Sequence, residues 1–95
     1  MGTDAQVTHE PQRKRFVARL DERESHLVYV PAGAGVVDFL STYVHPALRG
    51  RGVGEALVKA GLEWARAEEL KVIPSCWFVA TVVRRHPEYA SLLEG

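Results

Sequence analysis

Three glycines at alternate positions, Gly50, Gly52 and Gly54, separate a strand-like segment from the strongest helix signal in the chain. The helix signal covers residues 53–69, where apolar side chains recur at helical spacing along one stripe. The strand-like segment covers residues 36–44, and its imperfect alternation is typical of a strand that is covered on both faces. This strand–loop–helix unit predicts a parallel return strand, because a crossover helix joins parallel neighbours.

The return strand is expected at residues 71–74, a short Lys-Val-Ile-Pro segment. Two earlier segments, residues 15–20 and 25–32, are rich in β-branched and aromatic side chains and predict two further strands. The polar cluster at residues 21–24 and the glycine turn at residues 33–35 connect these strands. The expected fold is therefore α/β (α+β), with one mixed sheet and the element order β-β-β-α-β-α.

A second helix is expected over residues 76–85, with Ser75 as its N-cap and Pro87 just beyond its end. A short turn or helix should follow at residues 88–93. Residues 1–12 are polar and show no periodicity, so they predict a disordered tail. Residues 13–95 then form one compact domain.

Composition narrows the class of partner. Twelve basic residues balance twelve acidic ones, which argues against nucleic acid as a partner, since that affinity depends on many phosphate contacts. No apolar run is long enough for a membrane span, and no early segment resembles a signal peptide, so a cytoplasmic protein is expected. The one cysteine, Cys76, excludes an intramolecular disulfide and a cysteine-rich metal site, and no metal is expected.

The glycine loop has the composition of a phosphate-binding turn. A pyrophosphate needs several backbone N–H groups directed at it, and side chains at Gly50, Gly52 and Gly54 would block its approach. The helix that follows adds the positive end of its dipole, and Arg49 and Arg51 add cationic charge. The alternative is a loop whose glycines merely cap that helix.

Two common phosphate motifs do not fit the loop. A P-loop requires Gly-Lys-Ser or Gly-Lys-Thr at its end, whereas Gly54 is followed by Glu55 and Ala56. A dinucleotide fingerprint requires its last glycine three residues after the second glycine, and an acidic residue about 20 residues further on. The glycine spacing here is shorter, and Pro74 occupies the position of the acidic residue.

The pattern Arg49-x-x-Gly52-x-Gly54 resembles the [Gln/Arg]-x-x-Gly-x-[Gly/Ala] signature of the GNAT acyltransferase superfamily, in the same strand–loop–helix setting. The segment from Pro74 to Val79 and the run from His86 to Tyr89 are similar to a compact GNAT-like family of about this length. The resemblance covers most of the chain, from about residue 29 to residue 92.

The resemblance implies that the ligand is acetyl-CoA and that the preceding strand hydrogen-bonds the pantetheine arm. Carried over residue by residue, it implies a cofactor-binding set made up of the strand end and the whole loop: Thr42, Tyr43, Val44, Arg49, Gly50, Arg51, Gly52, Val53 and Gly54. It implies an N-acetyltransferase acting on an unidentified amine or thiol acceptor. A monomer or weak homodimer is expected.

The chain departs from the usual GNAT pattern in three places. Only residues 21–24 lie between the first two predicted strands, where larger GNAT enzymes carry helices that help to form the acceptor pocket. Val82 occupies the position of the tyrosine that many of them use as a general acid. No acidic residue stands out as a general base, because Tyr43 occupies the natural strand position.

Cys76 and His45 are the candidate catalytic residues. Cys76 is expected at a helix start, where the dipole favours a thiolate, and near the expected thioester. The alternative for Cys76 is a small buried packing residue. His45 ends the strand just before the loop and belongs to the residue type that exchanges protons near neutral pH, although a surface histidine on a turn is the alternative. His86 is expected to end the second helix. Trp77 and Phe78 are expected to pack on the sheet, and lining the mouth of a channel is the alternative for both.

Two functions remain open at this stage. The first is acetyl transfer to an amine, by direct attack or through an acetyl-Cys76 intermediate. The second is a non-catalytic module that binds or senses acetyl-CoA.

Overall fold

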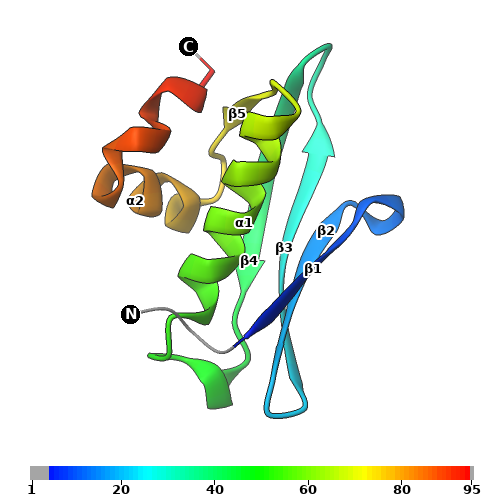
Figure 1. The fold of residues 1–95 in the computed structure, drawn as a ribbon, viewed down its shortest axis with the longest axis vertical. Helices are drawn as coiled ribbons and strands as arrows, with labels where there is room; N and C mark the ends of the chain where they lie inside the picture. The colour runs from blue at the N-terminus through cyan, green and yellow to red at the C-terminus, as the bar shows by residue number, and fades with distance from the viewer. Residues whose placement is uncertain (1–4, 95) are drawn as a thin grey trace.

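A computed structural model describes residues 5–94 of the chain. Five strands form one sheet in the order β1-β2-β3-β4-β5 (Figure 1). The strands are β1 (Gln6–Glu10), β2 (Arg15–Leu20), β3 (Arg23–Pro31), β4 (Val36–Tyr43) and β5 (Lys71–Ile73). The first four pair antiparallel in sequence order, and β5 pairs parallel to β4. The mixed sheet and the parallel β4–β5 pair confirm the fold predicted from the sequence.

The predicted disordered tail at residues 1–12 is wrong where the structure describes it, and residues 1–4 lie outside the described part. Residues 6–10 are an edge strand whose ladder with β2 runs from Gln6↔Arg19 to Glu10↔Arg15. Its inward side chains include His9, which stacks on Phe16 with ring centroids 4.2 Å apart. The domain therefore begins before residue 13, and the observed order has one more strand than predicted.

The connection between the first two strands is a short 3-10 turn, Pro11–Arg13. No α-helix lies in this connection, as predicted, but the connection lies at residues 11–14 rather than at the predicted residues 21–24. Asp21 and Glu22 instead form the tight turn between β2 and β3, both with positive φ.

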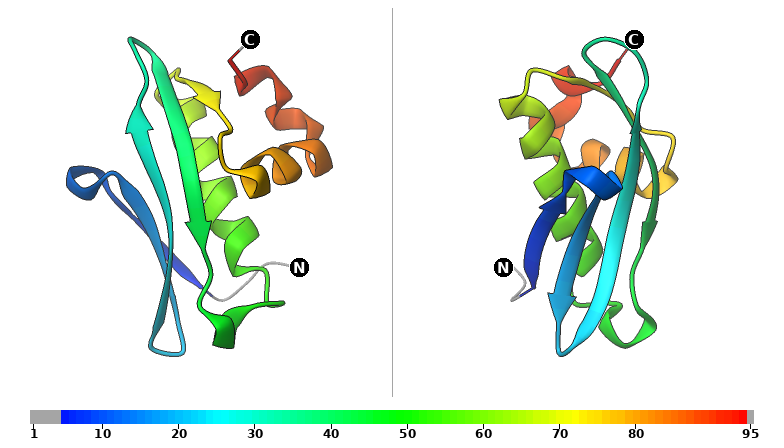
Figure 2. Two further views of the ribbon diagram at one scale, coloured as in Figure 1. Left: turned by 180° about the vertical axis from the view of Figure 1, so that it is seen from behind. Right: turned by 90° about the vertical axis from the view of Figure 1, so that its right-hand side faces the viewer.

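Helix α1 (Val53–Ala67) crosses one face of the sheet, as the views in Figure 2 show. The helix buries an apolar stripe that includes Leu57 and Leu62 against inward-facing sheet residues such as Leu27 and Phe39, all four without solvent exposure. Among the described residues, the opposite face is crossed by no helix, and Val30, Leu40 and Tyr43 are exposed on it. None of the described helices is long and apolar enough to span a bilayer.

Helix α2 (Trp77–Arg85) lies beside the β4–β5 side of the sheet, and a 3-10 segment (Pro87–Leu92) follows it. The N-cap of α2 is Cys76 rather than the predicted Ser75, so the helix begins one residue later than predicted. Trp77 is 76% exposed, which contradicts its predicted packing on the sheet. Phe78 does pack, partly buried, against the core.

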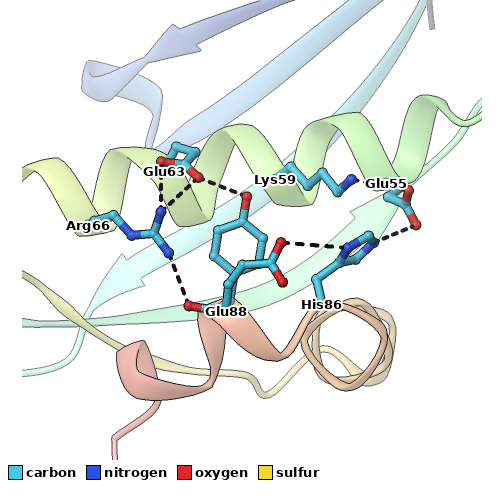
Figure 3. Close-up of polar contacts among 7 residues, drawn as sticks. Glu55, Lys59, Glu63, Arg66, His86 and Glu88 are labelled. Carbon is cyan, nitrogen blue, oxygen red and sulfur yellow. Dashed lines mark hydrogen bonds and ion pairs between the residues drawn. The ribbon is translucent and has the colours of Figure 1, made fainter. Parts of the chain in front are cut away.

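A polar network holds the 3-10 segment on α1 (Figure 3). The Tyr89 hydroxyl donates to Glu63 at 2.8 Å, and the Arg66 guanidinium donates to both Glu63 and the Glu88 carbonyl. Burial and the hydrogen bond to Glu63 raise the pKa of Tyr89 to about 12. The C-terminal end then closes the β5 edge through a parallel bridge between Val72 and Leu93.

Candidate functional site

The loop between β4 and α1 presents free backbone donors. Gly50 and Gly52 have φ of 81° and 77°, in the left-handed region that glycine adopts without strain. Among the described residues, the N–H groups of residues 50–55 have no hydrogen-bond acceptor, and the next one, of Ala56, donates to the Gly52 carbonyl at 3.0 Å. Gly52 caps α1 without a side-chain bond. These unpaired N–H groups and the positive end of the helix dipole favour the binding of an anion at the loop.

A hollow of about 400 Å³ lies against this loop. Its floor is the loop and the start of α1, and its walls include Val44, Arg49, Phe78 and Arg85. Beside this hollow, α1 and α2 approach closely at Gly54, where an added Cβ would lie 3.0 Å from the Phe78 ring. Glycine at this position therefore serves helix packing as well as ligand access.

A second hollow of about 380 Å³ continues from the first toward Cys76. Val44, Arg49 and Phe78 line both hollows, and the second adds Thr42, Cys76 and Trp77. We call the two together the groove. The groove therefore runs along the end of β4 from the glycine loop to Cys76, the course that a long, narrow ligand with an anionic end would follow.

Cys76 lies where β4 and β5 separate. Their ladder ends at Asp38↔Ile73, and the Cys76 N–H then donates to the Phe39 carbonyl at 2.9 Å. The thiol is buried, and its Sγ lies 3.5 Å from Thr42 Oγ1. Thr42 can face Cys76 because Leu40 is a bulge: Val28 pairs with Ser41, but Tyr29 pairs with Phe39.

Three predicted site residues point their side chains elsewhere. The Arg51 guanidinium donates to Asp21 at 2.7 Å and does not line the groove. Tyr43 is 42% exposed on the opposite face, beside the His26 ring. His45 Nδ1 accepts the Ala47 N–H at 3.0 Å, so this nitrogen caps a 3-10 turn and the proton of the neutral ring is on Nε2. His45 lines neither hollow.

Phe78 forms the wall shared by the two hollows, in agreement with the alternative that it lines a channel mouth. Two residues of interest were not predicted. Arg85 faces the loop from the last turn of α2. Asp38 on β4 has a buried Oδ1 without a hydrogen-bond partner among the described residues. Of the two, only Asp38 had a signal in the sequence, as an acidic residue among the apolar residues of the first half of the strand.

A larger hollow, of about 640 Å³, lies near the β1–β2 connection and is lined by three arginines and two glutamates. Its charges largely pair with one another: Arg15 donates to Glu10 at 2.6 Å and Arg19 to Glu24 at 2.8 Å. The Arg15 hydrogen bond lowers the pKa of Glu10. Its lining includes neither a glycine loop at the start of an α-helix nor a cysteine, so the groove is the better candidate site. No group of three metal-ligating side chains occurs among residues 5–94.

A family model described as GCN5-related N-acetyltransferase matches residues 15–92, which include all of the groove. The chain belongs to the GCN5-related N-acetyltransferase family. Members of this family generally use acetyl-CoA as co-substrate and bind amine acceptors. Two of the three segments that carried the resemblance in the sequence, the glycine loop and the segment around Cys76, are the two ends of the groove.

Comparison with individual proteins supports the same family. Protein NATD1 of Gallus gallus is 35% identical over 88 residues, covering 90% of this chain and 80% of that protein. Protein NATD1 of Homo sapiens is 34% identical, with 90% and 78% covered. The solution NMR structure of a GCN5-like protein from Staphylococcus aureus superimposes with a TM-score of 0.74 at 27% identity, covering 95% of this chain and 88% of that one.

Val82, which the resemblance aligns with the tyrosine that many GNAT enzymes use as a general acid, has a side chain that is fully buried in the core.

Proposed function

We propose that the chain binds acetyl-CoA in the groove and transfers its acetyl group to an amine acceptor. The observation that supports this most is the continuity of the groove, which joins the free N–H groups of the loop to the buried Cys76. The pyrophosphate would accept from the loop donors, and the pantetheine arm would lie along Thr42 and Val44. The thioester would then lie near Cys76, where β4 and β5 separate.

The acceptor is proposed to approach from the open face of the sheet. An amine is protonated near neutral pH and must lose a proton before it attacks a thioester. Asp38 belongs to the face opposite Phe39 and lies at the last paired position of β4 and β5. Its unpartnered buried oxygen suits an ammonium group, so we propose Asp38 as the residue that binds the acceptor and takes its proton.

A two-step route through Cys76 is the competing mechanism. The Cys76 thiolate would attack the acetyl carbonyl, the CoA thiolate would leave, and the acceptor amine would then attack the new thioester. Exchange between two thioesters is nearly thermoneutral, so geometry would decide the rate. The position of Cys76 in the groove supports this route, whereas its burial among core residues supports packing alone.

Acetyl-CoA titration followed by calorimetry or NMR tests the binding proposal. Gly52→Val puts a β-branched side chain at φ 77° within the loop and should abolish binding. Gly35→Val is the matched control, because Gly35 has φ 73° in the β3–β4 turn, away from the groove. Both variants carry similar backbone strain, so the proposal requires Gly35→Val to bind normally. Equal binding by the three proteins would show that the loop is not the site.

The mass of the intact protein after incubation with acetyl-CoA separates the transfer routes. An acetyl group on the protein that hydroxylamine removes and Cys76→Ser abolishes would support the two-step route. With direct transfer, Cys76→Ser retains activity on an amine acceptor and Asp38→Asn loses at least about tenfold. Tight binding of acetyl-CoA with neither modification nor turnover across a panel of amines would instead identify a binding module.

A further inference from the structure

The two arginines that the sequence pattern identifies in the glycine loop do not supply a free cation to the far wall of the first hollow. Of the two loop arginines, Arg51 is held by Asp21 outside the hollow. Arg49 lies in the hollow, but its Nε donates to the Val44 carbonyl at 3.2 Å, which fixes it at the junction with the second hollow. A pyrophosphate carries two negative charges, so a further cation on the far wall would bind it strongly.

Arg85 is on that wall. It belongs to the last turn of α2 and lines the same hollow as Gly50, Gly52 and Gly54. Its side chain is exposed, and it makes no hydrogen bond or ion pair with any other described residue. The guanidinium is therefore available to a ligand without the loss of an existing contact.

The only carboxylate in the hollow, that of Glu55, is already paired. Its Oε2 lies 3.6 Å from Lys59 Nζ and its Oε1 lies 3.5 Å from His86 Nε2, so each oxygen has one partner (Figure 3). Because Glu55 is engaged on α1 and by His86, it does not hold the Arg85 guanidinium. The pairing also reduces the repulsion that a carboxylate would exert on a bound phosphate.

We infer that Arg85 is a pyrophosphate-binding residue that closes the hollow opposite the glycine loop. This inference rests on the proposed function, acetyl-CoA binding in the groove. The planar guanidinium can donate two parallel N–H bonds to phosphate oxygens, while the loop N–H groups bind from the other side. Helix α2 thus contributes a charge to the phosphate end of the groove as well as the apolar Phe78 wall.

The neighbouring arginine offers a matched control. Arg84 is also exposed in the last turn of α2, but its guanidinium donates to Thr81 Oγ1 at 3.1 Å and it does not line the hollow. Arg84→Ala and Arg85→Ala make the same change in net charge, one residue apart. A general electrostatic effect would weaken ligand binding equally in the two variants.

The test is calorimetric titration of the full chain, wild type and variants, with CoA, 3′-dephospho-CoA and pantetheine. Arg85→Ala should raise the Kd of CoA and of 3′-dephospho-CoA about tenfold, because both ligands contain the pyrophosphate. Arg84→Ala should stay within about twofold of the wild type. Pantetheine, which has no phosphate, should bind all three proteins alike. Arg85→Lys should retain part of the affinity, since it keeps the charge but lacks the planar guanidinium that donates two parallel N–H bonds.

Different results would overturn different claims. If Arg85→Ala binds CoA as the wild type does, the role of Arg85 is wrong while the proposed groove stands. If only CoA and not 3′-dephospho-CoA loses affinity, Arg85 contacts the 3′-phosphate and the pyrophosphate assignment is wrong. If the wild type binds neither nucleotide, the proposed function itself fails, and the role of Arg85 fails with it.

Discussion

Replacing Gly54 with alanine should damage ligand binding more than stability. An added Cβ would lie 3.0 Å and 3.2 Å from two atoms of the Phe78 ring and 3.1 Å from a Val44 methyl group. Both neighbours line the two hollows, and both are only partly buried. Phe78 can therefore relieve the contact by moving outward, which displaces the wall that the hollows share.

Gly61→Ala is the matched comparison on the same helix. Its Cβ would meet Leu27 at 3.0 Å and Phe39 at 3.1 Å, nearly the same crowding, but these side chains are fully buried and cannot move into solvent. Overpacking of this kind costs about 1–3 kcal/mol, against a gain of about 1 kcal/mol from helix propensity. The net range is about 0–2 kcal/mol, so we expect Gly61→Ala to be destabilised by about 1 kcal/mol, and Gly54→Ala by less.

Two measurements distinguish the variants. Thermal unfolding should show a larger fall in Tm for Gly61→Ala, at about 4–8 °C per kcal/mol for a domain of this size. Acetyl-CoA titration of the folded proteins should show the opposite order, with Gly54→Ala weakened about tenfold and Gly61→Ala unchanged. A Gly54→Ala protein that binds acetyl-CoA normally would refute the reasoning that Phe78 shapes the groove.

Two further predictions concern pH. Because the pKa of Tyr89 is raised to about 12, folding favours its protonated form. The contribution of Tyr89 to the free energy of unfolding is therefore complete below about pH 10 and is lost as the pH rises towards 12. Tyr89→Phe removes the hydrogen bond to Glu63 and should lower the free energy of unfolding by about 1 kcal/mol near neutral pH. The variant should not show the further loss of stability at alkaline pH. Urea unfolding at several pH values measures both effects. Burial lowers the pKa of His9, an effect that Glu68 partly opposes, so folding favours the neutral ring. The contribution of His9 to the free energy of unfolding should be complete above about pH 6.5 and should fall as the pH drops through the lowered pKa. His9→Phe should remove that acid-side slope, and an unchanged slope would show that other groups cause it.

Much of the fold could be predicted because two kinds of signal are strong in this sequence. The helical stripe from Val53 onward and the glycine loop identified the crossover, and the crossover determined the parallel pairing of β4 with β5. The second helix was also predicted, although it begins one residue later than predicted. The Cys76 N–H is used by the Phe39 carbonyl, a contact between residues far apart in sequence, and the helix begins only after it.

The incorrect predictions share a physical cause, because each feature depends on residues that are distant in the sequence. Strand β1 has few apolar residues, and its burial comes from ring contacts of His9 with Phe16 and Trp64. The direction of the Arg51 side chain is decided by Asp21, 30 residues earlier. The place of Arg85 in the hollow follows from how α2 packs on α1, which no local pattern encodes.

The bulge at Leu40 determines which residues of β4 face the groove. Before the bulge, odd-numbered residues of β4 such as Phe39 face α1; after it, Thr42 pairs with inward-facing Leu27 and faces Cys76. A chain with Leu40 deleted would join Phe39 directly to Ser41 in a continuous ladder, and Thr42 would still pair with Leu27 and face Cys76. If the full-length strand instead paired without the bulge, Leu40 would take the place opposite Val28, and Thr42 would turn outward and Tyr43 inward. The one extra residue held in the bulge therefore decides which side chain of β4 reaches the Cys76 end of the groove.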